Sequence, residues 1–272
     1  MQPSEMYRIC TGALRDYVTG AGFTDVVIGL SGGIDSSVVA VMAADALGAD
    51  HVHGVLLPGP YSSEHSIFDA EELARNLHIE TRTISICEPF EAFERVLGAA
   101  CGGELSGLAA ENTQARCRMT CLMALSNAHD WMMLNTGNKS ESMTGYSTLY
   151  GDTAGAFAPM GGIYKTDVYA VARWRNDCAL ELGEIAPIPE NVLAKPPSAE
   201  LSADQSDEES LGVDYATLDR ILVEHIERGR DVDDIAGMGF DRAQVAEVVS
   251  RAASYAFKRA MEPPYPTADF YA

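Results

Sequence analysis

The chain has 272 residues, of which 47% are hydrophobic, so it can fold around a sizeable core without disulfide or metal support. It carries 19 Lys and Arg residues against 40 Asp and Glu residues, and the resulting net charge of −21 repels nucleic-acid phosphates and anionic membrane surfaces. No apolar run approaches the roughly 20 residues that a membrane-spanning helix needs, so we expect a soluble protein with neither nucleic acid nor membrane as a partner.

The N-terminal residues and the cysteines indicate the compartment. The first residues contain neither the basic cluster nor the apolar core of a secretory signal, which predicts a cytoplasmic protein. The six cysteines include no C-x-x-C pair and are expected to be free, buried thiols. The six histidines form no metal-binding pattern, so any metal is expected to have oxygen ligands.

Strands and helices are predicted to alternate along the first half of the chain. Short apolar runs predict buried strands at residues 25–30, 52–57, 79–86 and 131–135, and helical patterns lie at residues 36–47, 64–77 and 108–129. This alternation is typical of a parallel sheet whose two faces are both covered by helices. We therefore predict an α/β fold with a doubly wound parallel sheet, in a single domain spanning residues 1–272.

A proline-rich connection is predicted to follow. Pro187, Pro189, Pro196 and Pro197 are incompatible with a regular helix or a central strand, so a loop is expected there.

Residues 200–209 contain five acidic residues and no basic one, which favours a solvated, mobile segment. The segment of about 195–212 is either a plain surface loop or a functional lid, because long loops in compact domains are often functional. Helices predicted at about 214–228 and 241–261 make residues 214–262 a helical C-terminal part of the same domain.

The most specific motif is GLSGGIDSS at residues 29–37, between a predicted strand and a predicted helix. Gly32 and Gly33 permit backbone conformations in which successive N–H groups converge on an anion at a helix start. Asp35 would repel a phosphate, so its carboxylate is best explained by a Mg²⁺ ion between the two. Neither the P-loop motif nor a G-x-G-x-x-G motif after a strand occurs. The motif predicts a site for a magnesium nucleotide; a generic glycine turn is the alternative.

This loop resembles the pyrophosphatase loop of the N-type ATP pyrophosphatases, which cleave ATP between its α and β phosphates to adenylate a substrate. Six later motifs, in the same order, are similar to those of NAD synthetases: YSSEHS at 61–66, ENTQARCRM at 111–119, TGNKSE at 136–141, GYSTLYGD at 145–152, YKT at 164–166 and KPPSAEL at 195–201. The resemblance runs from about residue 10 to 262, and is closest to the synthetase half of the glutamine-dependent enzymes. It implies the adenine nucleotide alpha hydrolase-like fold.

The resemblance also implies roles for individual residues. ATP contacts are implied for Gly29, Leu30, Ser31, Gly32, Gly33, Ile34, Asp35, Ser36, Thr136, Lys165 and Ser198. Contacts with deamido-NAD are implied for Arg116, Phe257 and Lys258. Asp35 and Glu141 are implied to hold Mg²⁺, and Asp152 and Lys165 to act in catalysis, with Asp152 handling the ammonia.

Each of three charged residues also has a purely structural alternative. Glu141 could form a surface salt bridge, Lys165 could simply begin a helix, and Asp152 could cap a turn, since Tyr-Gly-Asp is typical of turns.

The implied reaction converts ATP, deamido-NAD and NH₃ into AMP, diphosphate and NAD through an adenylated intermediate, the last step of NAD biosynthesis. The chain shows no counterpart of the glutaminase half, so free ammonia or a separate glutaminase chain is expected to supply nitrogen. Members of the family form homodimers that bind deamido-NAD across the interface. The helix at 108–129, apolar around Met119, Leu122, Met123 and Leu125, is a candidate interface element, although core packing explains its apolar face equally well.

The chain departs from commoner short members of the family at Leu149, where many have Lys, and at Ala156, where they have a substrate-contacting Asp. The segment after Arg259 also differs. Two rival functions therefore remain. One is another adenylating enzyme, such as a tRNA thiolase, which the net charge and the lack of paired catalytic cysteines oppose. The other is a non-catalytic adenine-nucleotide sensor.

Overall fold

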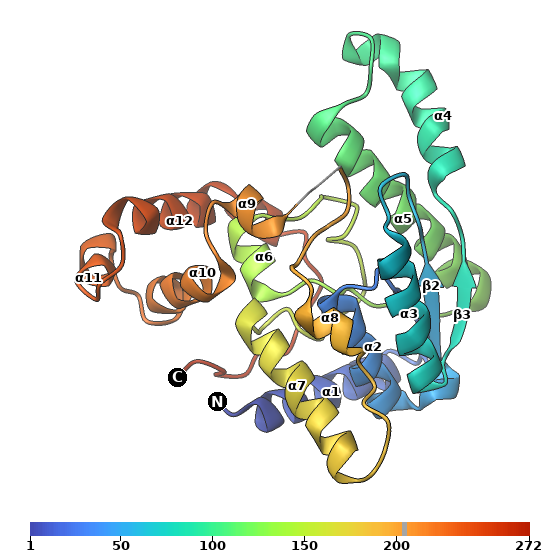
Figure 1. Cartoon of the computed structure of the whole chain (residues 1–272), viewed down its shortest axis with the longest axis horizontal. Coiled ribbons are helices and arrows are strands. Elements are labelled where there is room, and N and C mark those ends of the chain that lie inside the picture. The colour runs from blue at the N-terminus through green and yellow to red at the C-terminus, as the bar shows by residue number, and fades with distance from the viewer. Residues whose placement is uncertain (203–205) are drawn as a thin grey trace.

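A computed structural model describes residues 1–202 and 206–272 (Figure 1). Its sheet has four parallel strands, β1 (Val26–Gly29), β2 (Val52–Leu56), β3 (Glu80–Thr83) and β4 (Met132–Met133), in the order β3-β2-β1-β4. Val26 of β1 is in register with Val52 on one side and with Met132 on the other. The chain therefore starts the sheet at its centre and adds strands outward in both directions, which confirms the predicted doubly wound α/β fold.

Helices cover both faces of the sheet because successive residues of a buried strand point to opposite sides. Val26 and Ile28 belong to an apolar cluster with α1 (Pro3–Gly20), α2 (Ile34–Leu47), α3 (Glu64–Leu77) and α7 (Lys165–Glu181). Val27 belongs to a second cluster, with α4 (Cys87–Leu97) and α5 (Gly107–His129). The helices α1 and α4 were not anticipated from the sequence, whereas α3 has the predicted bounds.

The C-terminal part forms a separate helical lobe beside the sheet, at the left of Figure 1. Its core is a third apolar cluster that includes Leu218, Ile221 and Val245. The remaining helical elements are η1 (Ala49–His51), η2 (Gly98–Cys101), α6 (Lys139–Thr144), α8 (Glu190–Ala194), α9 (Asp207–Leu211), α10 (Tyr215–Leu222), the π-helical turn η3 (Val223–Glu227), α11 (Val232–Ala236), α12 (Arg242–Ser254) and α13 (Ala256–Arg259). The predicted helices at 214–228 and 241–261 thus exist, the second with a break at Tyr255.

The proline-rich connection was wrongly expected to contain no helix. The short helix α8 fits between the prolines, because Pro189 precedes its first residue and the helix ends before Pro196. Proline is compatible with the start of a helix and with the residues just beyond its end.

The acidic segment was expected to be solvated, but two of its acidic residues are buried or partly buried. Asp207 is buried at the start of α9, and Glu200 is half-buried with its carboxylate hydrogen-bonded to α3. Asp204 lies outside the described residues.

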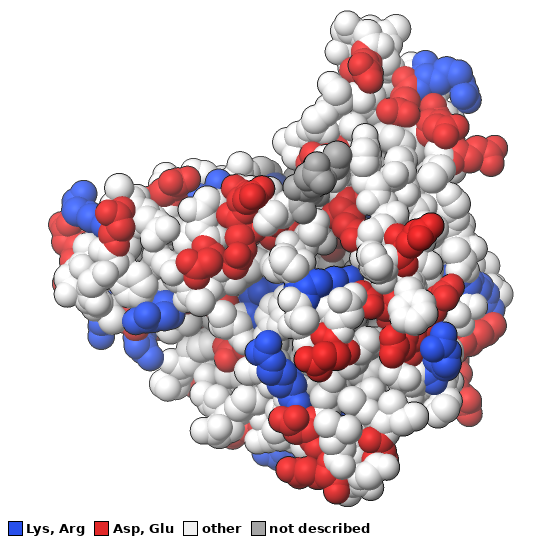
Figure 2. Space-filling model, in the orientation of Figure 1, with Lys and Arg blue, Asp and Glu red and all other residues white. Residues whose placement is uncertain are grey.

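The cysteines are free, as predicted, but not all are buried. Cys10 and Cys117 are buried, Cys101 is exposed, and the other three are partly exposed. Within the described chain, no helix combines the length and the apolar character needed to cross a membrane. On the face shown in Figure 2, acidic side chains spread over both the helical lobe and the side of the sheet, and outnumber the basic ones.

Candidate functional site

A cavity of about 350 Å³ lies at the carboxyl ends of β1, β2 and β4. In open parallel sheets this edge is where ligands bind. The cavity is lined by the phosphate loop (residues 29–37), the segment after β4, one side of α5, and a strap that we define as residues 195–201. Segments that are far apart in the sequence therefore meet at one site.

Glycine and serine residues shape the phosphate loop. Gly32 has a left-handed backbone (φ 78°), and a Cβ atom there would lie 2.1 Å from the carbonyl oxygen of Ser66, so only glycine fits. The Ser31 N–H donates to Ser36 Oγ (3.2 Å) and the Gly33 N–H donates to Ser31 Oγ (3.2 Å). The first turn of α2 borders the cavity, where the helix dipole favours a bound anion.

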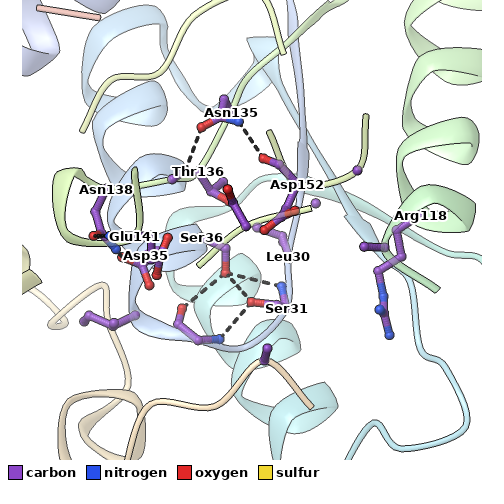
Figure 3. A pocket seen from close by; sticks show the side chains of 18 of the residues that line it. Leu30, Ser31, Asp35, Ser36, Arg118, Asn135, Thr136, Asn138, Glu141 and Asp152 are labelled. Carbon is purple, nitrogen blue, oxygen red and sulfur yellow. Dashed lines mark hydrogen bonds between the residues drawn. The ribbon is translucent and has the colours of Figure 1, made fainter. Parts of the chain in front are cut away.

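Lys165 joins two carboxylates at one end of the cavity. Its Nζ contacts Asp35 Oδ2 and lies 3.3 Å from Glu141 Oε1, and Asn138 Nδ2 donates to Asp35 Oδ1 (2.9 Å). The Lys165 side chain is 2% exposed, whereas those of Asp35 and Glu141 are each 19% exposed. Figure 3 shows Asp35, Glu141 and Asn138 side by side.

Burial and charge shift the pKa values of this group. Burial alone would lower the pKa of Lys165, but the charges of Asp35 and Glu141 outweigh it and raise the pKa. Burial raises the pKa of Glu141 to about 8, although the charge of Lys165 acts against this shift. Lys165 is therefore a fixed positive charge, and Glu141 is not the surface salt bridge that was one alternative.

A buried aspartate fixes the helices that carry Glu141 and Lys165. Asp219 of α10 accepts hydrogen bonds from Ser140 Oγ (2.5 Å) and from the Thr166 N–H (2.8 Å). Ser140 Oγ in turn accepts a hydrogen bond from the Lys165 N–H (2.8 Å). The starts of α6 and α7 are thus tied together from the helical lobe.

Asp152 does cap a turn, as its structural alternative proposed. Its Oδ1 accepts a hydrogen bond from the Thr148 N–H (2.5 Å), and Asn135 Nδ2 donates to the Asp152 carbonyl oxygen (2.7 Å; Figure 3). Asp152 also lines the cavity. Burial raises the pKa of its carboxyl group, and the hydrogen bond from Thr148 opposes this shift.

The structure brings most of the predicted site residues to the cavity. Those lining it are Gly29, Leu30, Ser31, Gly33, Ile34, Asp35, Ser36, Thr136, Glu141, Asp152, Lys165 and Ser198. Gly32 lies behind the loop, against Ser66.

The three predicted dinucleotide contacts lie outside the cavity. Arg116 is exposed and its Nε donates to the Leu149 carbonyl oxygen (3.1 Å), and Phe257 is 59% exposed. Lys258 Nζ donates to the carbonyl oxygens of Gly145 (2.7 Å) and Ser147 (2.5 Å).

Sequence reasoning missed several residues that line the cavity. Arg118, Asn138, Lys195, Glu200 and Asp207 are among them. Arg118 Nε donates to the Leu57 carbonyl oxygen (3.0 Å), and burial lowers the pKa of its guanidinium group. Its helical spacing of four residues from the buried Leu122 was a signal that it points inward. Asn138, Lys195 and Glu200 lie within the motifs at 136–141 and 195–201, which gave them no individual role. No local pattern marks Asp207, because its partner Tyr146 lies far away in the sequence.

The carboxylates next to Lys165 are suited to bind a magnesium ion whose other ligands are phosphate and water oxygens. Asp35 and Glu141 converge on one positive charge, and both side chains border the cavity. Within residues 1–202 and 206–272 no group of three His, Cys, Asp or Glu residues could hold a metal ion alone. Mg²⁺ in nucleotide sites is held by one or two carboxylates together with substrate phosphates and water.

Comparisons with known proteins give consistent matches. A sequence model of a family described as NAD synthase matches residues 6–262. A curated glutamine-dependent NAD(+) synthetase of Thermotoga maritima is 49% identical over 259 residues, which cover 95% of this chain but 44% of that protein. This chain therefore spans less than half the length of that relative.

Solved structures match the whole fold. The glutamine-dependent NAD+ synthetase of Acinetobacter baumannii in complex with adenosine diphosphate has a TM-score of 0.68 and 37% identity, covering 99% of this chain and 48% of that one. The NH3-dependent NAD synthetase of Campylobacter jejuni in complex with the nitrate ion has a TM-score of 0.74 and 28% identity, covering 95% of this chain and 96% of that one.

Proposed function

This chain belongs to the NAD synthase family, and from that premise we propose that it forms NAD from deamido-NAD, ATP and ammonia, acting as a carbon–nitrogen ligase. The observation that carries the proposal is the placement of Lys165 between Asp35 and Glu141, beside a phosphate loop at the carboxyl edge of the sheet. An enzyme that cleaves ATP needs this combination of a phosphate cradle, a fixed cation and carboxylates for a metal ion.

The first half-reaction is adenylation. A carboxylate is a poor acyl donor because its leaving group would be oxide, so the nicotinate carboxylate of deamido-NAD attacks the α-phosphorus of ATP and diphosphate leaves. This in-line transfer requires mainly positioning and charge neutralisation. The phosphate loop and the first turn of α2 would bind the phosphates, and Lys165 would neutralise part of their charge.

Asp35 and Glu141 would hold Mg²⁺, which supplies additional positive charge against the phosphate oxygens. Asn138 holds the Asp35 carboxylate from the side, so that carboxylate is oriented by the fold.

The second half-reaction is the attack of ammonia on the acyl carbon, with AMP as the leaving group. Ammonium must lose a proton first, and Asp152 is the group that we propose accepts it. Because burial raises the pKa of Asp152, it is a stronger base than an exposed aspartate. The hydrogen bond from the Thr148 N–H keeps the carboxylate in place.

We further propose that the enzyme is a homodimer, as the resemblance implies. The exposure of Arg116 and Phe257 supports this, because residues expected to contact the dinucleotide do not reach the cavity within one chain. A second copy could complete the dinucleotide site with these surfaces.

We also propose that ammonia is the nitrogen donor. The likeness in fold and sequence to the NH3-dependent NAD synthetase of Campylobacter jejuni supports the use of ammonia itself. A separate glutaminase chain could deliver the ammonia instead.

The test is NAD formation by the purified chain with ATP, Mg²⁺ and deamido-NAD, with ammonium chloride or glutamine as nitrogen source, while diphosphate release is followed. Activity with ammonium alone supports the proposal. Diphosphate release without NAD formation would indicate another adenylating enzyme, and ATP binding without diphosphate release would indicate a sensor. A D35N variant is the negative control, because it retains the shape of the site but loses a carboxylate that we assign to the metal ion.

A further inference from the structure

The strap is tied to the first turn of α3 by Glu200. Glu200 Oε2 accepts a hydrogen bond from the Ser63 N–H (3.1 Å), and Oε1 accepts one from Ser63 Oγ (2.9 Å) and one from Ser66 Oγ (2.6 Å). These partners lie more than 130 residues earlier in the sequence. A carboxylate that accepts three hydrogen bonds at a helix N-terminus is held more firmly than a neutral side chain would be.

The backbone of Glu200 is strained in the position that permits these contacts. Its φ angle is 48°, in the left-handed region that residues with a Cβ atom rarely adopt. Such a conformation persists only where surrounding interactions hold it. The three hydrogen bonds of the carboxylate are the interactions that do so here.

Three further hydrogen bonds hold the ends of the strap. At its start, Lys195 Nζ donates to Ser66 Oγ (3.0 Å) and lies 2.8 Å from Oδ2 of the buried Asp69. At its end, Gln114 Nε2 of α5 donates to the Leu201 carbonyl oxygen (2.9 Å). Ser198, a predicted ATP contact, therefore lies in a short span that is fixed on both sides.

The same turn of α3 also supports the phosphate loop. Gly32 packs directly against the backbone carbonyl of Ser66, whose hydroxyl group donates to Glu200. One residue thus touches both the loop that would bind phosphates and the strap that closes the cavity beside it. A movement of the phosphate loop or of the strap would therefore displace Ser66 and, through it, the other of the two.

We propose that Glu200 is a positioning residue for nucleotide binding, which joins the strap to the phosphate loop through Ser63 and Ser66 so that both present their ligands in one fixed arrangement. The inference rests on the proposed function, since it assumes that the cavity binds ATP. Glu200 borders the cavity, but both oxygens of its carboxylate accept hydrogen bonds from Ser63 and Ser66, so we assign its action to the strap and α3.

The decisive variants are E200A and E200Q, with E64Q as the matched control. Glu64 is an exposed acid in the same first turn of α3, and none of the described contacts involves its side chain. We expect E200A to raise the KM for ATP at least about tenfold, while kcat changes less than about threefold, because the hydrogen bonds lost are to a charged group. E200Q, which keeps an acceptor oxygen, should recover part of this loss, and E64Q should match the wild type.

ATP binding by calorimetry and hydrogen exchange of the Ser63 amide provide readouts that do not need turnover. E200A should weaken ATP binding to the same degree as it raises KM, and should speed exchange at Ser63, whose N–H loses its acceptor. If the wild type binds no ATP, the proposed function fails. If the wild type binds ATP and E200A binds it equally well, only the positioning role fails.

A second variant covers the case in which E200A does not fold. S66A keeps Glu200 but removes the hydroxyl group shared by Glu200 and Lys195. It should weaken ATP binding in the same direction, and unchanged binding in S66A would overturn the role of this junction.

Discussion

Two charged clusters lie at opposite ends of the same sheet. At the carboxyl end, Lys165 joins Asp35 and Glu141 beside the cavity. At the amino end, the buried ring of His53 lies between Asp25 Oδ1 (3.0 Å from Nε2) and Glu80 Oε2 (3.2 Å from Nδ1). The chemistry of the two clusters is similar, since each places one basic side chain between two carboxylates.

Their surroundings differ. The His53 ring stacks on Trp131 with ring centroids 3.7 Å apart, and Trp131 also stacks on His129. None of these amino-end residues lines the cavity. At the carboxyl end, the two carboxylates border open space and a phosphate loop. Charged groups that converge on one another mark a functional site only where the fold leaves room for a ligand next to them.

The largest expected effect is a difference in activity between variants of the carboxyl-end cluster and variants of the amino-end cluster. E141Q should lower kcat/KM about 10²- to 10³-fold, because it removes a carboxylate that we assign to Mg²⁺, and that ion would neutralise charge on the phosphates. E80Q at the amino end should leave NAD formation within about twofold of the wild type. Steady-state assays of both variants test this difference. Wild-type activity in E141Q would contradict the proposed difference between the two clusters.

Lys165 should matter for stability as well as for activity. In K165M two neighbouring carboxylates lose their shared cation, and we expect a loss of about 3 kcal/mol in the free energy of unfolding. Urea denaturation measures this loss. The double variant D35N/K165M should regain part of it, since one of the facing charges is gone. Equal stability of the single and double variants would show that the carboxylates do not repel each other.

His53 should matter for stability alone. H53A removes a stacked ring and leaves Asp25 and Glu80 without their shared partner, which should cost about 2 kcal/mol. The kcat and KM values of the folded variant should stay within about twofold. A large fall in kcat for stable H53A protein would mean that the two ends of the sheet are coupled.

The smallest expected effect is a pH dependence of opposite sign at the two ends. Burial tends to raise the pKa of Asp25, but hydrogen bonds from Thr24, His53 and His51 outweigh it and lower the pKa. Asp25 therefore stabilises the fold above its ordinary pKa of 3.8, and this contribution is lost as the pH falls through the lowered folded value. The stability difference between wild type and D25N should accordingly grow as the pH rises from about 3.

Asp219, which supports the carboxyl-end cluster, should behave in the opposite way. Burial raises its pKa, against the hydrogen bonds from Ser140 and Thr166. Its favourable contribution is full below 3.8 and is lost as the pH rises through the raised folded value. The stability difference between wild type and D219N should thus shrink as the pH rises above 3.8. Urea denaturation of both variants from about pH 3 to 7 would show whether the two trends diverge.

The carboxyl-end cluster could be predicted in part because its central motif is local. The strand, glycine turn and helix at residues 26–37 follow one another directly, so the sequence itself carries the geometry of the phosphate loop. Asp35, Glu141 and Lys165 could be named from motif resemblance, and the structure does bring them together. Their shared contact could not be derived from spacing, because they lie on three different helices.

The acidic segment at residues 200–209 shows where prediction from sequence fails. Glu200 and Asp207 lie in a run of acidic residues that has the composition of a solvated loop, yet both face inward. What buries them is a set of hydroxyl groups elsewhere in the chain: Ser63 and Ser66 for Glu200, and Tyr146 for Asp207. No pattern within residues 200–209 records the presence of those partners.

Helix α4 was missed although its apolar Phe90 is buried, because no strand follows it to complete an alternating pattern.

The cavity walls also include Pro263 and Tyr265, and the Tyr265 ring packs on Gly161. The last strand of the sheet ends at Met133. On the ribosome all four strands are therefore synthesised well before the binding site is complete, since more than a hundred residues remain to be translated. At about 5–20 residues per second this interval lasts roughly 7–26 seconds. A chain released before residue 263 would lack these two walls of the cavity, and also Phe270 of the core that covers one face of the sheet.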